Sequence, residues 1–166
     1  MAIGIGASGL PLTAEIVGIA VLGLLLSACL WWTYFAQDDR RAEEAMRAAP
    51  PPERGRMAIR GFGYCHLLLL LGIIAIAAGL EEAIAHPFDR LETDPAVVMA
   101  AGASLYLLGD VLFRRSLHLT ATGPWRLLAA VLLLAAIPLG TAVSAVAELA
   151  LLVAVFGGAL LLEAER

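Results

Sequence analysis

Five long apolar runs, separated by shorter polar segments, dominate the pattern of the chain. They lie near residues 12–35, 61–85, 96–113, 125–139 and 142–162. A helix needs about 20 residues to cross roughly 30 Å of hydrocarbon, and most of these runs supply that length. The pattern predicts an all-α fold, a polytopic membrane helix bundle of about five transmembrane helices. We expect a single transmembrane domain over residues 1–166.

The apolar stretch that begins at Trp125 continues for roughly 38 residues, which is too long for one membrane span. Pro138 removes a helix donor and Gly140 tolerates a turn, so these two residues favour a break. We therefore expect two helices joined by a tight hairpin at Leu139 to Thr141. One kinked helix is the alternative.

The segment at residues 36–60 is charged and separates the first two apolar runs. Pro50, Pro51 and Pro52 follow a short charged helical turn in this segment. A proline run favours extended, solvated backbone. We therefore predict a cytoplasmic linker here, without a second domain.

Arginine is concentrated in two of the segments between the predicted helices. These arginines are Arg40, Arg41, Arg47, Arg54, Arg56 and Arg60 in the first segment, and Arg114, Arg115 and Arg126 in the second. The connection between the second and third helices has only Arg90, and the last hairpin has no basic residue. Because basic loops tend to stay in the cytoplasm, we expect the N-terminus outside and the C-terminus inside.

Composition supports an integral membrane protein. Of the 166 residues, 61% are hydrophobic and 16% are charged, and the mean hydropathy is +0.87. A soluble domain would struggle to stay in solution with such a composition. Aromatic side chains with an apolar body and a polar tip settle at headgroup depth. We interpret one run at the end of the first helix as an interfacial anchor in the lipid bilayer: Trp31, Trp32, Tyr34 and Phe35.

Charge and cysteine usage exclude several other classes. The net charge is −4, and acidic neighbours balance the arginine-rich segment, so we expect no nucleic-acid partner. No basic residue precedes Arg40, which argues against a cleaved signal peptide. Cys29 and Cys65 have no metal-ligand spacing, and we interpret them as reduced, buried thiols. We expect no metal.

Several short motifs point to a known family. They are Trp31-Trp32-x-Tyr34-Phe35, Tyr64-Cys65-His66, Gly79-Leu80-Glu81 before His86-Pro87, and Leu105-Tyr106-Leu107-Leu108-Gly109. In these motifs the chain resembles the bacterial low temperature requirement protein A family. The resemblance covers most of the chain and implies a polytopic protein of the bacterial inner membrane. The family name records a growth phenotype, so the resemblance implies no particular reaction.

The chain differs from that family in length. Members are typically about twice as long, and this chain is similar to their C-terminal half. The resemblance therefore implies either a missing N-terminal half or a homo-oligomer that replaces it. Ala150, Ala154 and Gly158 are spaced four apart on the last helix and offer a small-residue surface for such a contact.

Carboxylates at membrane depth form the candidate ion or proton site. Glu15, Glu81, Glu82 and Glu148 come from three helices and should lie toward the outer face, with His86 nearby. One interpretation is an acidic vestibule that admits a cation or proton and exchanges protons near neutral pH. The alternative is that Glu81 and Glu82 mark a helix end at the headgroups, and that Glu15 occupies a first helical turn.

Glu148 is the hardest of these carboxylates to explain as a helix-end residue. It lies in an uninterrupted apolar run, about 9 Å beyond Ala142 at the helical rise. We expect it roughly two turns into the fifth helix, where a charge needs a partner or a wet cavity.

A second group of polar residues should lie toward the cytoplasm. Tyr64, Cys65 and His66 are on the second helix, and Asp110 and Arg114 are on the third. Because Asp110 and Arg114 are four residues apart, we expect a local ion pair. His66 is either a proton shuttle or a hydrogen-bonded core histidine.

Haem binding and the common hydrolytic motifs find no support in the chain. His66 and His118 both fall toward the cytoplasmic side, but His118 follows a basic pair in a polar loop, so no facing axial pair remains. The chain contains no GxSxG, no HExxH and no glycine-rich phosphate loop. We expect no cofactor and no enzymatic activity.

Two functional hypotheses remain. The first is a proton- or cation-coupled transporter, or half of one, and the depth predicted for Glu148 favours it. The second is a non-transporting structural or partner-binding membrane component, which the brevity of the chain favours. The residues do not identify a substrate.

Overall fold

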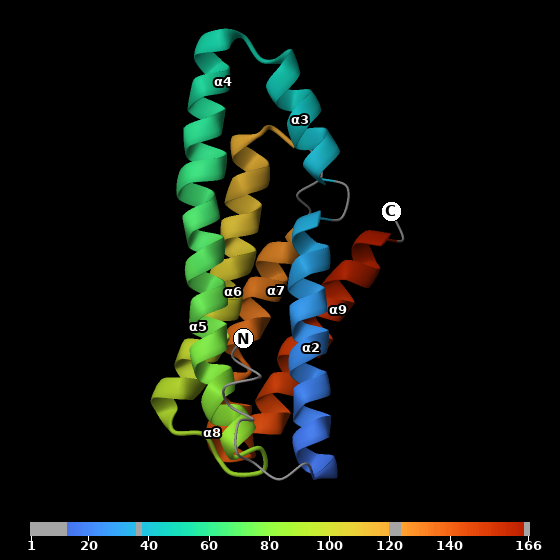
Figure 1. Ribbon diagram of the computed structural model, residues 1–166, viewed down its shortest axis with the longest axis vertical. Coiled ribbons are helices and arrows are strands. Elements are labelled where there is room, and N and C mark those ends of the chain that lie inside the picture. Colours follow the sequence, from blue (N-terminus) through green and yellow to red (C-terminus); the bar gives the residue numbers. More distant parts are fainter. Residues whose placement is uncertain (1–12, 36–37, 120–123, 165–166) are drawn as a thin grey trace.

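Five apolar helical spans run along the long axis of the molecule (Figure 1). The computed structural model describes residues 13–35, 38–119 and 124–164. Within these residues, five helices are long and apolar enough to cross a membrane. The predicted all-α membrane bundle is therefore confirmed.

The helices follow one another with short connections. In chain order they are α2 (Ala14–Phe35), α3 (Asp38–Ala48), α4 (Pro51–Ala58), the π-helical segment η1 (Ile59–Cys65), α5 (His66–Ala85), α6 (Thr93–Ser116), α7 (Pro124–Leu134), α8 (Ile137–Ala142) and α9 (Ala145–Ala164). The elements α4, η1 and α5 form one continuous rod, and α7 and α8 together form the fourth span.

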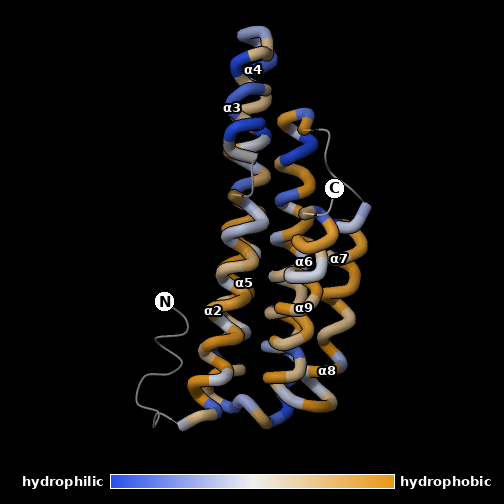
Figure 2. The backbone as a smooth tube through the Cα atoms, turned by 90° about the vertical axis from the view of Figure 1, so that its right-hand side faces the viewer, coloured by the Kyte–Doolittle hydropathy of each residue, from blue (hydrophilic) through white to orange (hydrophobic). Residues whose placement is uncertain are grey.

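The two ends of the bundle differ in charge. We call the end that carries α3, α4 and the last turn of α6 the arginine-rich end. The opposite end, which carries residues 86–92 and the turn between α8 and α9, is called the acidic end. Figure 2 shows that the hydrophilic α3 and α4 extend beyond the apolar part of the bundle. The separation of a polar cap from an apolar bundle fits a protein whose apolar helices lie in hydrocarbon and whose cap lies in water.

The proline run begins a helix at its second residue. Pro50 is extended, with φ −59° and ψ 152°, and Pro51 and Pro52 occupy the first positions of α4. The backbone N–H groups of Glu53 and Arg54 donate to the carbonyl of Pro50, at 3.0 and 2.9 Å. Proline fits a first helical turn because its missing N–H would have no partner there. The prediction of extended backbone is therefore wrong at Pro51 and Pro52, whereas Pro50 is extended.

The last two spans separate later than predicted. Pro138 lies in the first turn of α8, and residues 139–141 are helical. The chain reverses at Val143 and Ser144, where the Ser144 hydroxyl accepts a bond from the N–H of Ala147 at 3.3 Å. This serine cap satisfies a free donor at the start of α9, which Gly140 cannot do. The predicted hairpin at Leu139 to Thr141 was therefore misplaced by a few residues.

Glycines bring the backbones of α5 and α6 together. A Cβ added at Gly72 would lie 2.8 Å from the carbonyl oxygen of Gly102, and one added at Gly102 would lie 2.8 Å from the amide nitrogen of Ile76. A side chain at either position would therefore meet backbone, which cannot move aside. Small residues allow two helices to approach closely, and α5 packs more extensively on α6 than on any other helix.

The helix α2 packs mainly on α9 and makes few contacts with α5. Its buried side chains include Ile19 and Leu26, and the facing side of α9 buries Leu149, Leu152 and Phe156. These residues belong to one apolar core that also includes parts of α5, α6 and α7. The sparse contact between α2 and α5 leaves room between these two helices.

Replacing Gly102 with alanine should destabilise the bundle. The added Cβ would overlap the backbone of α5, and overpacking of this kind typically costs about 1–3 kcal/mol. We expect the midpoint of thermal unfolding in detergent to fall. Gly157→Ala is the matched control, because a Cβ at Gly157 would meet nothing within 4 Å. If both variants melted like the unsubstituted protein, the tight α5–α6 contact would be refuted.

Candidate functional site

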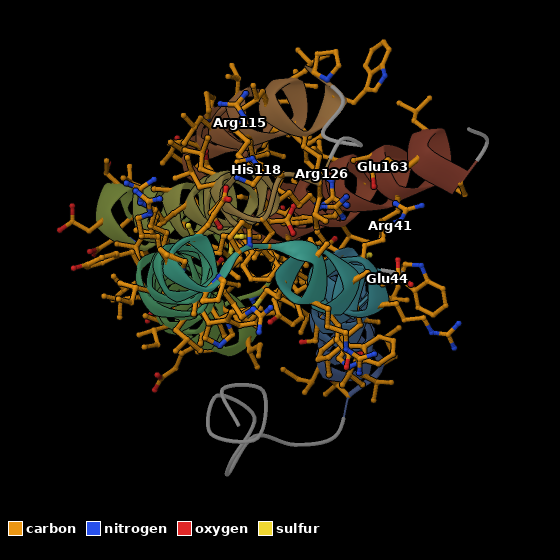
Figure 3. All side chains as sticks on the ribbon, turned by 90° about the horizontal axis from the view of Figure 1, so that it is seen from above. Arg41, Glu44, Arg115, His118, Arg126 and Glu163 are labelled. Atoms are coloured by element: carbon orange, nitrogen blue, oxygen red, sulfur yellow. The ribbon has the colours of Figure 1, made fainter. Side chains whose placement is uncertain are left out.

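Four charged side chains meet inside the bundle near the arginine-rich end. Arg126, on α7, is 1% exposed and donates through Nε and Nη2 to the two carboxylate oxygens of Glu163, at 2.5 and 2.7 Å. Its Nη1 donates to Asp110 Oδ2. Figure 3 shows Arg126 and Glu163 directed toward one another from α7 and α9. One guanidinium thus bridges two carboxylates from two other helices.

Arg114 completes this buried network. Its Nε lies 3.2 Å from Asp110 Oδ2, and both side chains are at least 95% buried. These contacts bring two guanidinium groups together with two carboxylates. Buried charges are tolerated when they are paired and hydrogen-bonded. The network joins α6, α7 and α9 at one level of the bundle.

The sequence predicted only part of this network. The local pair between Asp110 and Arg114 is present, as the four-residue spacing indicated. Arg126 was interpreted only as a loop arginine, and Glu163 was not singled out. A weak signal existed, because both residues stand at helix ends that the positive-inside pattern places on the same side. Opposite charges at one predicted depth could have suggested the pair.

Glu148 is buried near the acidic end in a different environment. Its relative exposure is 0%, and neither carboxylate oxygen has a hydrogen-bond partner among the described residues. A Cβ added at Gly140 would overlap the carboxylate, so the glycine of α8 leaves the space that this side chain fills. A buried polar group without a hydrogen bond is costly, and this distinguishes Glu148 from the paired carboxylate of Asp110.

Glu148 lies closer to a helix end than predicted. The helix α9 begins at Ala145, so Glu148 is in its first turn and not two turns inside. The positive end of the helix dipole favours a carboxylate at this position. The depth prediction was wrong because the turn between the last two spans comes later than expected. The burial of Glu148 results from packing against α8.

Backbone hydrogen bonds join residues 86–92, at the acidic end, to the segment around the turn that precedes Glu148. The N–H of Leu91 donates to the carbonyl of Gly140 at 3.0 Å. The N–H groups of Ala145 and Val146 donate to the carbonyls of Asp89 and Pro87, at 3.0 and 2.9 Å. The last two bonds satisfy free donors at the start of α9, and all three join residues 86–92 to the segment around the turn. They help to separate Glu148 from the surroundings of the bundle.

The other predicted carboxylates of this group are exposed. Glu15, Glu81 and Glu82 all lie on the surface of the bundle. The His86 imidazole, itself exposed, lies 4.0 Å from Glu82 and 3.7 Å from Asp89. The four predicted carboxylates therefore differ in environment, since only Glu148 is enclosed. A shared acidic vestibule stays a prediction.

The residues predicted to lie beside Asp110 differ in how far they are exposed and in what they contact. Tyr64 is 68% exposed, Cys65 is buried, and the His66 ring packs beside the Tyr34 ring with centroids 5.8 Å apart. His66 Nδ1 has no hydrogen-bond partner among the described residues. His66 therefore differs from the predicted hydrogen-bonded core histidine at this nitrogen, and its role as a proton shuttle stays a prediction.

The side chain of His118 lies on the surface of the molecule. Its side chain is 71% exposed, and its Nε2 lies 3.5 Å from Glu53. Across residues 13–35, 38–119 and 124–164, no cluster of three or more His, Cys, Asp and Glu side chains is arranged to hold a metal ion.

The aromatic run at the end of α2 divides between surface and interior. Trp31, Trp32 and Phe35 are about half exposed, and the rings of Trp31 and Phe35 stack with centroids 5.1 Å apart. Tyr34 turns inward and is only partly exposed, near Phe113 and His66. Three of the four rings therefore occupy positions suited to an interfacial anchor, and that role stays a prediction.

Comparison with known proteins gives the family. The model of the bacterial low temperature requirement A protein (LtrA) matches residues 1–161. An uncharacterized protein of Rhizobium meliloti (strain 1021) is 27% identical over 97 residues, which are 58% of this chain and 23% of that relative. The matched segment therefore spans about a quarter of the curated relative. No solved structure matches the chain. With its family match over nearly all of its length, the chain belongs to the bacterial low temperature requirement A protein family.

Proposed function

We propose that this protein carries protons or another cation across the membrane, and that Glu148 binds and releases the transported charge. The observation that carries the proposal is the complete enclosure of Glu148, whose oxygens accept no hydrogen bond from a described residue. A structural carboxylate would normally be paired, as Asp110 is. We propose transport and not catalysis.

The chemistry of an enclosed acid supports this role. Without a partner, a carboxylate inside an apolar bundle is far more stable in its neutral, protonated form than as an anion. Release of the proton requires water, a cation or a rearrangement that opens the site. Such an acid can therefore couple the movement of a charge to a change in the bundle. Glu15, Glu81 and Glu82 would concentrate cations at the acidic end.

The network around Arg126 would serve as the closed end of the pathway. It joins α6, α7 and α9 through buried ion pairs, and α9 also carries Glu148. Opening the arginine-rich end would separate charges in an apolar surrounding, which is costly. A conformation that exposes Glu148 toward that end would have to break or rearrange these pairs.

The distribution of arginine supports one orientation of the chain in the membrane. We propose that the arginine-rich end faces the cytoplasm and the acidic end faces outward, in the bacterial inner membrane. The described arginines of the first end, Arg40 to Arg60 and Arg114 to Arg126, contrast with Arg90 at the other. Basic residues close to membrane spans favour this orientation.

A second candidate is a non-transporting membrane component that acts through its partners. The observation that favours it is the outer face of α9, where Ala150 and Ala154 are exposed and a Cβ at Gly158 would meet nothing within 4 Å. Small residues allow another helix to approach closely. A second copy of the chain, or further helices of a longer protein, would fit such a face.

Replacing Glu148 with glutamine should abolish transport. Glutamine keeps the shape of the side chain but cannot gain or lose a proton, so flux should fall at least tenfold. The measurement is dissipation of a pH gradient in liposomes that contain the polypeptide at its native length. An intact mass near 17.4 kDa would establish that this chain is the native unit.

The exposed Glu44→Gln, on α3, is the matched control and should keep the flux. Thermal unfolding of both variants should stay close to that of the unsubstituted protein. A Glu148→Gln protein that transported normally but unfolded at lower temperature would make Glu148 structural and would contradict the proposal.

Replacing Asp110 with asparagine should strongly destabilise the bundle. Arg114 would lose its buried carboxylate and Arg126 would keep only Glu163, and breaking a buried pair typically costs about 3–5 kcal/mol. The double variant Asp110→Asn with Arg114→Gln restores neutrality and should recover part of the loss. Unfolding by denaturant in micelles measures both. A double variant as unstable as the sum of its single changes would show that the charges do not act together.

Cysteine labelling tests the orientation. In a background without Cys29 and Cys65, Arg90→Cys should react with a membrane-impermeant maleimide on intact spheroplasts. Arg56→Cys, on the exposed surface of α4, should react only after the membrane is opened. The reverse pattern would place the arginine-rich end outside and overturn the proposed orientation.

A further inference from the structure

Two adjoining cavities lie where α2 approaches the arginine-rich end. One, of about 500 Å³, lies between the end of α2, α3 and η1, and Arg47, Arg54 and Phe62 line it. The other, of about 340 Å³, lies between α2 and α5. Tyr34 and Phe35 line both, so the two cavities meet at the last turn of α2. Together they form a path from the polar cap into the apolar part of the bundle.

The deeper cavity is a groove with an apolar lining. On α5 it extends from His66 to Ile73, a rise of about 10 Å, and on α2 it includes Leu30 and Trp31. Leu70 and Ile73 are more than 40% exposed, so the groove opens sideways where lipid chains would lie. A length of about 10 Å covers most of one leaflet, which is half of roughly 30 Å of hydrocarbon. The groove is therefore apolar enough and long enough to bind an acyl chain.

Among the described side chains that line the shallower cavity, positive charge exceeds negative charge. They include Arg47, Arg54 and Glu43, which are two guanidinium groups and one carboxylate. Glu43 pairs with Arg47 at 2.5 Å, and both side chains are largely exposed. The remaining guanidinium, that of Arg54, has no carboxylate partner within the part of the chain that the structure describes.

Arg54 is held in place by backbone carbonyls at the end of α3 and just after it. Its Nη2 donates to the carbonyl oxygens of Arg47 and Ala49, at 3.2 and 3.1 Å. Among the described residues, its Nε and Nη1 have no acceptor. A guanidinium held by two carbonyls, with further donors unused, is preorganised for a phosphate oxygen. Arg54 lies beside the last turn of α3, beyond the end of the apolar α2. It lines the same cavity as Phe35, the last residue of α2, so the positive rim continues outward from the apolar groove (Figure 2).

We propose that the two cavities bind one anionic phospholipid of the leaflet at the arginine-rich end. An acyl chain occupies the groove between α2 and α5, and the phosphate binds Arg54 and Arg47. The stacked rings of Trp31 and Phe35 stand beside the junction at the level of the glycerol. An apolar groove that ends at a positive rim matches an amphiphile with a negative head. The proposal does not depend on transport by Glu148.

Native mass spectrometry of the full chain in detergent tests this site. Dioleoyl-phosphatidylglycerol should remain bound as one molecule per chain, at least tenfold more than dioleoyl-phosphatidylcholine, which has the same acyl chains. The anionic lipid should also raise the midpoint of thermal unfolding more than the zwitterionic one, since a ligand stabilises the state that it binds. Equal retention of the two lipids would overturn the proposal.

Two sets of variants locate the site. Arg47→Gln with Arg54→Gln should reduce retention of phosphatidylglycerol at least fivefold. Arg56→Gln with Arg60→Gln is the matched control, because it removes the same charge from exposed positions that do not line either cavity. If the control variant lost as much lipid as the first, binding would reflect net charge and the assigned site would be wrong.

A variant that leaves the charges in place tests the groove. Ile73→Trp would fill the space between α2 and α5 at a position that is already 42% exposed, so folding should be preserved. It should lower retention of phosphatidylglycerol at least fivefold. Unchanged retention would exclude the groove, and a dimer that replaced bound lipid in the unsubstituted protein would show that a second copy is the occupant.

Discussion

Burial of charge between apolar helices is the constraint on which the organisation of this bundle depends. Separating a buried ion pair costs several kcal/mol, so helices that share one must keep their relative positions. Arg126 joins α7 to Asp110 on α6 and to Glu163 on α9. The level of Glu163 then determines the level of Glu148, because both belong to one helix. They are 15 residues apart (163 − 148), or about 22 Å along α9.

The two acidic residues Glu148 and Glu163 of α9 contrast in their electrostatics. Glu163 and Asp110 are compensated by guanidinium groups, whereas Glu148 faces Gly140 without a hydrogen-bond partner among the described residues. A network of paired charges holds helices together. A carboxyl group without a charged partner can instead change its protonation when water or a cation reaches it. Transport needs both properties, a closed end and a group whose charge can change. This pairing on one rigid helix is the physical basis of the proposed function.

Apolar packing, and not ion pairing, arranges α2, α5 and α6. Glycines place the backbones of α5 and α6 in direct contact, so these helices form a rigid pair. The helix α2 packs on α9 and leaves a groove against α5. The charged α3 and α4 extend from α2 and α5 and provide the arginines at its mouth (Figure 1). The inferred lipid site therefore follows from an incomplete helix contact beneath a basic cap.

The sequence by itself determined the number of spans, because the length of an apolar run reports directly on hydrocarbon thickness. It also determined the pair between Asp110 and Arg114, since four residues return a helix to the same face. The family was accessible from short motifs as well. Each of these features depends on neighbours in the chain.

Only the tertiary structure decided which distant groups meet. Arg126 bonds to residues 16 and 37 positions away, and no local period specifies such a contact. The burial of Glu148 depends on Gly140, across a turn that the serine cap placed later than Pro138 suggested. Glu15, Glu81 and Glu82 remained exposed although their predicted depth resembled that of Glu148. Hydropathy specifies how deep a residue lies, whereas the packing of helices decides what it faces.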